Sequence, residues 1–184
     1  MSTSAPAAAA NITVRAATSA DMPAVARIYA HHVLHGLGSF EETPPDLAEM
    51  ARRFETVTGA GFPYFVAERD GVVQGYAYIG PYRPRPAYRF TVENSVYITP
   101  GEVGRGVGTL LTERLLQAAV ERGARLMVAV IGDSANSASI ALHTRHGFQM
   151  VGTIRGAGYK RGQWVDTVMM QRALGPGTTT PPPA

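Results

Sequence analysis

Apolar residues in the first third of the chain follow helical spacing after a short strand at 12–15. Thr18 and Asp21 have the spacing of a capping box, which predicts that a helix starts there. Two amphipathic helices follow, because apolar residues recur at three- and four-residue steps. The first helix has Met22, Val25, Ile28, Tyr29 and His32 on one side, and the second has Leu47, Met50, Ala51, Phe54 and Val57.

Strand patterns dominate the middle of the chain. Segments 63–70 and 72–80 are joined at Asp70-Gly71, a pair typical of a tight hairpin. After a proline-rich link, segment 90–99 is rich in β-branched and aromatic residues, which predicts another strand. The helix at 109–123 is expected to bury one face: Leu110, Leu111, Leu115 and Ala118.

The last third continues with a buried strand at 125–131, a helix at 136–148 and an antiparallel pair at 148–155 and 164–172. The whole order, β-α-α-β-β-β-α-β-α-β-β, predicts a mixed α/β protein of one domain at 11–174, without an internal repeat. The ends, 1–10 and 175–184, are low-complexity tails that we expect to be poorly ordered.

Composition removes several classes of protein. With 184 residues and 45% hydrophobic residues, the chain can bury a sizeable core, and without cysteine it has neither disulfides nor a thiol nucleophile. The net charge is +3, but the basic residues are scattered, so we predict no nucleic-acid partner. No apolar run has membrane-spanning length and no signal pattern opens the chain, so we predict no membrane partner and a cytoplasmic location. His31, His32 and His35 lack a further ligand nearby, so we predict no metal.

A glycine loop, Gly104-Arg105-Gly106-Val107-Gly108, separates the strand at 90–99 from the helix after it. A strand, a side-chain-poor turn and a helix N-terminus leave several backbone N–H groups that converge, an arrangement that suits a phosphate. Glycine spacing does not fit a nucleoside triphosphate loop or a dinucleotide fingerprint. A plain glycine-rich turn before a helix remains the alternative.

Segment 103–108 resembles the pyrophosphate loop of GCN5-related N-acetyltransferases (GNAT), with Val103 where that loop has Gln or Arg. A second motif resembles the same family: Asn136-x-x-Ser139-x-x-x-His143-x-x-x-Gly147-Phe148. In that family the Asn contacts the cofactor arm, and a Tyr at the position of His143 protonates the departing thiolate. The likeness runs from about Thr13 to Arg172.

The resemblance implies a single-domain α/β GNAT fold, with a mixed, mostly antiparallel sheet whose splayed central strands are flanked by helices. The arm of acetyl-CoA would enter between the strands that hold Val96 and Val128. A homodimer formed through the last hairpin is also implied. The expected cofactor-binding residues are Val96, Tyr97, Ile98, Val103, Gly104, Arg105, Gly106, Val107, Gly108, Thr109, Asn136, Ser139 and His143.

Segments 80–97 and 156–166 look like the substrate segment and late hairpin of phosphinothricin acetyltransferases and of methionine sulfoximine or sulfone acyltransferases. The likeness implies a small amino-acid-like acceptor, although Arg83 stands where phosphinothricin acetyltransferases often have Lys. Guanidinium groups match a carboxylate or phosphinate in bidentate fashion. We expect substrate contacts from Phe40, Arg83, Arg85, Tyr88 and Glu93. A solvated basic loop, and a core role for Phe40, are the alternatives.

Acetyl transfer to an amine requires a neutral nitrogen, so a base must remove a proton from the ammonium. Glu93 is the candidate, directly or through a water, because an apolar strand around it would raise its pKa by desolvation. A Glu on a solvated strand edge is the alternative. A backbone N–H near Ile98 would stabilise charge on the thioester oxygen. His143 would protonate the thiolate as imidazolium, or else only hydrogen-bond cofactor or water.

The sequence thus predicts an acetyl-CoA-dependent N-acetyltransferase that transfers acetyl directly to the α-amine of phosphinothricin, methionine sulfoximine or methionine sulfone. Two alternatives stay open. Another small amine, such as a polyamine or aminoglycoside, would meet like charge at Arg83 and Arg85. A non-catalytic acyl-CoA-binding sensor would have no use for Glu93 and His143.

Overall fold

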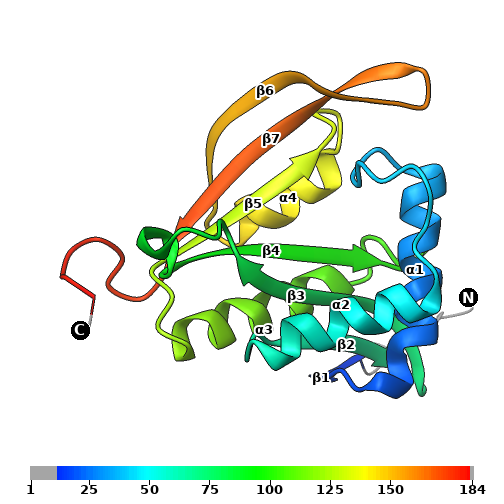
Figure 1. Cartoon of the computed structure of the whole chain (residues 1–184), viewed down its shortest axis with the longest axis horizontal. Coiled ribbons are helices and arrows are strands. Elements are labelled where there is room, and N and C mark those ends of the chain that lie inside the picture. The colour runs from blue at the N-terminus through cyan, green and yellow to red at the C-terminus, as the bar shows by residue number, and fades with distance from the viewer. Residues whose placement is uncertain (1–11, 183–184) are drawn as a thin grey trace, which may run out of the picture.

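A computed structural model describes residues 12–182, so the predicted tail at 1–10 lies outside the described residues (Figure 1). The helices are α1 (Met22–His35), α2 (Leu47–Gly59), α3 (Val107–Glu121) and α4 (Ser137–Arg145), with short 3₁₀ helices at Ser19–Asp21 and Pro86–Tyr88. The strands are β1 (Ile12–Ala16), β2 (Tyr64–Arg69), β3 (Val72–Pro81), β4 (Thr91–Ile98), β5 (Leu126–Gly132), β6 (Gln149–Lys160) and β7 (Gln163–Ala173). The predicted order of elements is confirmed.

The strands form one seven-stranded sheet in the order β1-β2-β3-β4-β5-β7-β6. Only β4 and β5 are parallel, and every other pair of neighbours is antiparallel. The ladder between β4 and β5 runs from Thr91↔Leu126 to Asn94↔Ala129 and goes no further, although both strands continue. The two central strands therefore splay beyond Asn94, as predicted for the strands of Val96 and Val128.

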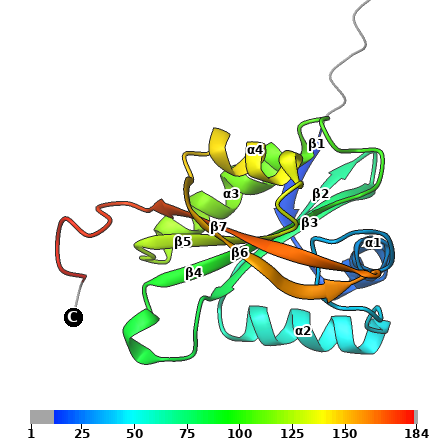
Figure 2. The ribbon, with the colours of Figure 1, turned by 90° about the horizontal axis from the view of Figure 1, so that it is seen from above.

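Helices cover both faces of the sheet. Figure 2 shows α3 and α4 on one face and α1 and α2 on the other. Each face has its own apolar core, one centred on Leu111, Leu115 and Met127 and the other on Met22, Val25 and Tyr76. Because successive side chains of a strand point to opposite faces, β2, β3 and β4 contribute to both cores, whereas β5 and β7 contribute only to the first.

Local signals account for several of these elements. Asp70 and Gly71 both have positive φ, 51° and 75°, as the predicted tight hairpin requires. Thr18 and Asp21 form the predicted capping box before α1, and Asp21 also accepts two hydrogen bonds from Arg15 at 2.8 Å. Both features depend on residues that are close in sequence, which is why the pattern predicts them.

Some predicted details are wrong. Leu110 and Leu47 were expected on buried faces, but they are 36% and 49% exposed. In α3 the predicted Leu111, Leu115 and Ala118 are buried together with Val107, and Leu110 lies at the edge of that stripe. The final strands are longer than predicted, because the ladder tolerates an irregularity between Ile154 and Gly158 and continues to a turn at Arg161-Gly162.

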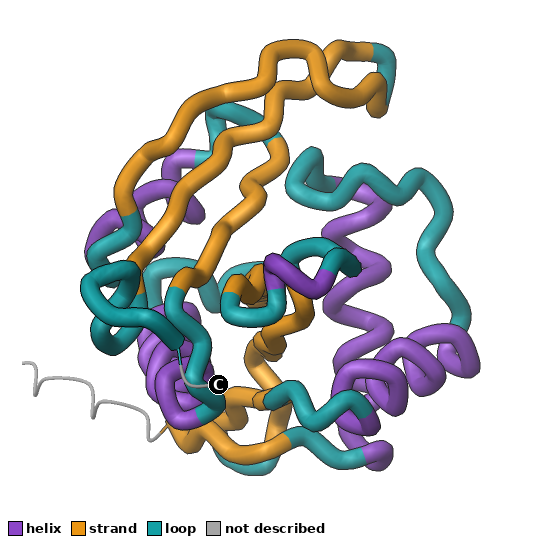
Figure 3. The backbone as a smooth tube through the Cα atoms, turned by 60° about the vertical axis from the view of Figure 1, so that its left-hand side comes forward, coloured by secondary structure: helices purple, strands orange, loops and turns teal. Residues whose placement is uncertain are grey.

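The hairpin of β6 and β7 extends beyond the rest of the sheet toward the loop after α1 (Figure 3). Lys160, at the end of β6, is buried and donates from Nζ to the carbonyl oxygen of Ser39 at 2.6 Å. At the other end of the sheet, Arg125 donates to Gly177 O and Pro181 O, both at 3.2 Å, within the predicted C-terminal tail. The first contact fixes the hairpin against the loop at 36–46.

Candidate active site

Beyond Asn94 the splay leaves the backbone of β4 without a ladder partner in β5. Thr99 N donates to Gln74 O at 2.8 Å, so in this antiparallel ladder every second residue of β4 bonds β3. Val96 and Ile98, at the alternate positions, therefore direct their peptide groups away from β3 and toward the gap. Ile98 O accepts a hydrogen bond from His32 Nε2 at 2.8 Å, so the N–H group is what Ile98 offers to a ligand.

Tyr97 is placed differently from its two neighbours. It pairs with Tyr76 across the β3–β4 ladder, and its ring packs on the Tyr76 ring at 5.1 Å, on the face covered by α1 and α2. Neither its peptide groups nor its ring are directed into the gap. Of the three residues of β4 expected to contact a cofactor, the structure brings only Val96 and Ile98 to the gap.

The glycine loop has the open backbone that an anion requires. Gly104 and Gly106 have φ of 82° and 87°, and a Cβ atom at either position would meet no atom within 4 Å. Gly106 is the N-cap of α3, so the first N–H groups of this helix, from Val107 to Thr109, have no partner inside it. These donors and the helix dipole favour a phosphate group at this end of α3.

Side chains of the loop point mostly elsewhere. Val107 is fully buried in the core, so only its main chain is available, and Val103 is 61% exposed. Arg105 donates to one carboxylate oxygen of Glu102 at 3.2 Å, and Arg69 donates to the other at 2.6 Å. Backbone amides rather than side chains are thus what this loop offers to an anion.

The second motif forms the start of α4. Asn136 is its N-cap and accepts from Ser139 N at 3.2 Å through Oδ1. Ser139 in turn offers its carbonyl oxygen to His143 Nδ1 at 2.8 Å. The spacing that resembles a cofactor motif is therefore also a capping arrangement, and it leaves the amide N–H groups of Asn136 for other acceptors.

His143 is 4% exposed and both of its ring nitrogens have partners. Because a carbonyl oxygen can only accept, Nδ1 carries the proton, and Nε2 accepts from Asn94 Nδ2 at 2.9 Å. Burial lowers the pKa of His143 below its usual value, which favours this neutral form. Sequence reasoning missed Asn94, although a polar residue at an inward position of an apolar strand is a signal for it.

Glu93 lies on the other face of the sheet from Asn94 and His143, because it is the adjacent residue of β4. It is half-buried, and burial raises its pKa, as predicted, while the charge of Arg83 opposes that rise. In the β3–β4 ladder Glu93 pairs with Gly80 and Ser95 with Tyr78, so Glu93 and Tyr78 are diagonal neighbours. The two candidate catalytic residues therefore approach the splay from opposite faces.

The predicted acceptor residues other than Glu93 come from two loops, and the charge of one of them, Arg83, acts on Glu93. Arg83, Arg85 and Tyr88 are exposed residues of the link between β3 and β4, and the guanidinium of Arg83 lies over the Tyr82 ring at 5.1 Å. Phe40 comes from the loop after α1 and packs on the late hairpin, since a Cβ atom on Gly158 would lie 2.7 Å from its ring. Phe40 thus joins two segments beside the acceptor face.

Two negative findings concern the described part of the chain. Within residues 12–182 no three His, Asp or Glu side chains are grouped as metal ligands, although the rings of His31 and His35 lie 4.7 Å apart. No helix in the same range combines the length and hydrophobicity that a bilayer crossing requires.

Comparisons with known proteins point to one family. A family model described as an acetyltransferase (GNAT) domain matches residues 14–169. Phosphinothricin N-acetyltransferase of Alcaligenes faecalis is 51% identical over 92% of this chain and 86% of its own length. An L-methionine sulfoximine/L-methionine sulfone acetyltransferase of Pseudomonas aeruginosa is 40% identical over 91% and 98%. The crystal structure of a phosphinothricin acetyltransferase from Sinorhizobium meliloti, in complex with AcCoA, superposes with a TM-score of 0.91 at 47% identity, over 94% of this chain and 93% of that one.

Proposed function

This chain belongs to the GNAT family of N-acetyltransferases, and from that premise we propose that it transfers acetyl from acetyl-CoA directly to the α-amine of a small amino acid. Phosphinothricin, methionine sulfoximine and methionine sulfone are the favoured acceptors, since relatives at 51% and 40% identity are named for them. One observation carries the proposal. Where the β4–β5 ladder ends, the start of α3 and His143 lie on one face of the sheet and Glu93 on the other.

The described residues fit acetyl-CoA on the face of α3 and α4. Main-chain N–H groups between Val103 and Thr109 would hold the pyrophosphate, apart from that of Arg105, which donates to Glu102 O at 3.3 Å. Val96, Ile98 and Asn136 would bond the arm that runs into the gap. When bound, acetyl-CoA supplies a thioester whose carbonyl carbon accepts the amine and whose thiolate then leaves. The carbonyl oxygen of Ile98 is already bonded by His32, so Ile98 can offer the thioester oxygen only its N–H group. Such a donor would stabilise the negative charge that develops on the thioester oxygen.

Glu93 would prepare the acceptor. An α-ammonium is largely protonated near neutral pH, so its nitrogen must lose a proton before it can attack. Burial raises the pKa of Glu93 toward neutral pH, where a general base works best. The cofactor arm would lie on the opposite face of the sheet, which leaves the face of Glu93 for the acceptor. It would take the proton directly or through one water molecule.

The role of His143 follows from its protonation state. The ring is neutral, with the proton on Nδ1, and Nε2 faces Asn94 rather than an open space. A proton donor to a thiolate would need a proton on Nε2, so Asn94 would first have to turn or move away. A thiolate leaves readily without a strong acid. The pair of His143 and Asn94 would therefore act mainly by fixing the thioester end of the cofactor arm beside Asn94.

Acceptor recognition would come from the loops around Glu93. Arg83 and Arg85 are cationic and exposed on the link between β3 and β4, so either guanidinium can meet the α-carboxylate in bidentate fashion. Tyr88 and Phe40 would cover the acceptor from two sides. A polyamine or an aminoglycoside would meet two like charges on this link, which makes these amines poorer acceptors.

A homodimer in the cytoplasm is part of the proposal. The late hairpin exposes apolar side chains that a second copy of the chain would cover: Met150, Val151, Ile154, Tyr159 and Trp164, the last 71% exposed. Light scattering of the purified protein tests this point. A role in resistance would follow if phosphinothricin or a related toxic amino acid is the acceptor that the enzyme meets in the cell.

The experiment is a thiol-release assay with acetyl-CoA and a panel of amines. We expect rapid release with phosphinothricin and methionine sulfone, little with spermidine or kanamycin, and a product that mass spectrometry shows to be acetylated on the α-amine. Intact-protein mass spectra with acetyl-CoA alone should show no acetylated enzyme, as direct transfer requires. Binding of acetyl-CoA without thiol release from any amine would instead indicate a sensor domain.

A further inference from the structure

A cavity of about 230 Å³ lies on the acceptor face, between the sheet and α2. Its walls come from strands β2 and β3 and from helices α1 and α2, and they include Tyr64, Tyr76, Tyr78, Tyr29 and Arg53. We refer to it as the tyrosine cavity. None of its lining residues has a role in the steps described above. No local pattern in the sequence indicates the cavity, because these residues come from four separate elements.

Three stacked rings form the floor of the tyrosine cavity. The rings of Tyr64 and Tyr78 stack at 5.0 Å with 12° between their planes, and Tyr76 continues the stack at 5.8 Å from Tyr64. All three rings are held by the sheet, whose strands fix their spacing. Such a surface suits the methylene groups of a side chain, which gain contact with the rings without disturbing them.

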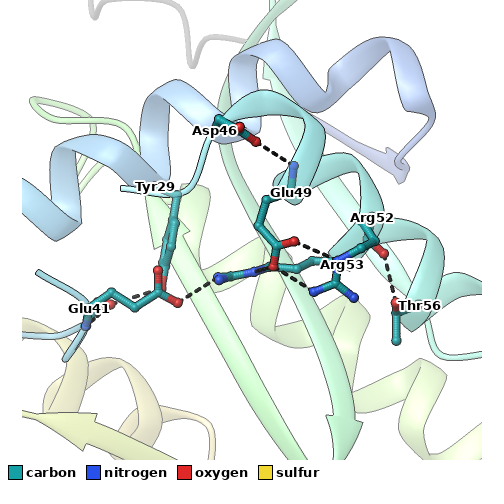
Figure 4. Close-up of polar contacts among 8 residues, drawn as sticks. Tyr29, Glu41, Asp46, Glu49, Arg52, Arg53 and Thr56 are labelled. Carbon is teal, nitrogen blue, oxygen red and sulfur yellow. Dashed lines mark hydrogen bonds and ion pairs between the residues drawn. The ribbon is translucent and has the colours of Figure 1, made fainter. Parts of the chain in front are cut away.

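Arg53 supplies the polar side of the cavity. Its Nε donates to Glu49 and its NH1 to Glu41, both at 2.7 Å, so the guanidinium is held in one orientation (Figure 4). Glu49 is also bonded by Arg52 at 2.7 Å, which fixes the carboxylate that holds Arg53. Among the described residues Nη2 of Arg53 has no such partner, so its N–H groups remain as donors for an acceptor group in the cavity.

The tyrosine cavity adjoins the proposed base. Tyr78, in its floor, is the diagonal neighbour of Glu93 across the β3–β4 ladder. Because neighbouring strands are about 4.8 Å apart, a cavity over β2 and β3 lies about 5–10 Å from β4. An amino acid whose amine is at Glu93 can therefore extend its side chain over Tyr78 and end near Arg53.

We infer that the tyrosine cavity is the side-chain subsite of the acceptor, in which the tyrosine floor packs on the methylene groups and Arg53 donates to oxygens at the distal end. This inference rests on the proposed function and adds the selection of the side chain to it. The class of acceptor is an α-amino acid with a short flexible side chain that ends in a phosphinate, sulfone or sulfoximine. A cationic side chain is disfavoured, since the remaining N–H groups of Arg53 can bond only an acceptor.

Two variants test the subsite, and both affect the same ion pair. Arg53→Gln removes the donor, whereas Glu41→Gln keeps the guanidinium and removes a carboxylate that competes for it. Binding of phosphinothricin and methionine sulfone is measured by calorimetry in the presence of coenzyme A, and KM is measured in parallel. We expect Arg53→Gln to weaken the binding of phosphinothricin about tenfold to a hundredfold, because a hydrogen bond between charged groups is lost. The binding of methionine sulfone should weaken less, because its sulfone is uncharged. Glu41→Gln should increase the affinity for phosphinothricin and leave the KM for acetyl-CoA unchanged.

The alternative is that Arg53 only anchors the loop of Phe40 through Glu41. In that case both variants would weaken the binding of every acceptor to the same extent, and both would lower the melting temperature. This result would overturn the inference. Equal phosphinothricin affinity in Arg53→Gln and wild type would also overturn it. Calorimetry separates this test from that of the proposed function, because Arg53-dependent binding without thiol release would support the subsite and contradict the reaction. Failure of the wild type to bind either acceptor would contradict the subsite.

Discussion

Asn94 donates from Nδ2 to Nε2 of His143 at 2.9 Å, across the interface between β4 and α4. The contact determines which protonation state of the histidine the fold stabilises, because the other ring nitrogen already donates to Ser139 O. An amide N–H pointing at Nε2 repels a second ring proton, and burial lowers the pKa of His143 further. The protein therefore keeps this imidazole neutral beside the end of the splay.

Asn94→Asp should raise the pKa of His143, because a carboxylate near Nε2 stabilises imidazolium where the amide opposes it. Ring nitrogen NMR of the purified variant, titrated between pH 4 and 9, measures the shift on a scale set by free histidine, about 6.5. Asn94→Leu is the matched control, since it removes the amide without adding charge, and it should leave the pKa of His143 low. Identical titrations of His143 in wild type and Asn94→Asp would contradict the assigned contact.

Replacing Gly106 tests the anion site at the start of α3. Its φ of 87° is a conformation that Asn tolerates, and a Cβ there would meet no atom within 4 Å. Gly106→Asn and Gly106→Asp therefore carry similar backbone strain and differ in one charge. We expect the Asp variant to bind coenzyme A at least about tenfold more weakly than the Asn variant, because its carboxylate faces the pyrophosphate. Calorimetry with coenzyme A measures both affinities, and equal values would place the phosphate elsewhere.

The features that the sequence predicts well depend on residues close together in the chain. Asp70-Gly71 requires a hairpin through its own backbone preferences, and the glycine loop requires a side-chain-poor helix start. Alternation along β4 places Glu93 and Asn94 on opposite faces, which is also a local inference. Leu110 was misplaced because an apolar residue beside a buried stripe has the same spacing as one inside it.

Contacts between segments that are distant in the chain could not be predicted from the sequence. The pair of Asn94 and His143 joins residues 49 positions apart, and Lys160 reaches Ser39 across 121 positions. The tyrosine cavity depends on how α2 packs over β2 and β3, which no spacing rule specifies. Tyr97 shows the same limit, because only the register with Tyr76 decides that its peptide groups bond β3 and leave the gap to its neighbours.

Asp21 should make the fold sensitive to acid. Two bonds from Arg15 hold the pKa of this buried carboxyl at about 2, well below its usual value. A lowered folded-state pKa means that the carboxylate stabilises the fold above the unfolded pKa of about 3.9, and that this stability is lost as pH falls through about 2. Because Arg15 is partly exposed, Asp21→Asn should cost about 1–2 kcal/mol at pH 7.

Urea unfolding of wild type and Asp21→Asn at pH 7 and at pH 2.5 measures that difference in the free energy of unfolding. The gap between the two proteins should narrow at the lower pH, where the carboxyl of the unfolded wild type is protonated. Glu121→Gln, at an exposed position near the end of α3, serves as the control and should change little at either pH. A gap of the same size at both pH values would remove the Arg15–Asp21 pair as its source.

The proposed base makes the strongest prediction about pH. Glu93 must be ionised to take a proton, so kcat/KM for the acceptor should fall as pH decreases through its raised pKa. Glu93→Gln should lower kcat/KM by about 10²- to 10⁴-fold and remove this acid limb, while the affinity for coenzyme A stays unchanged. Arg83 provides a second readout, because its charge lowers the pKa of Glu93. Arg83→Gln should therefore move the acid limb to higher pH, whatever it does to acceptor KM, and a limb that stays in place in this variant would mean that a different group titrates.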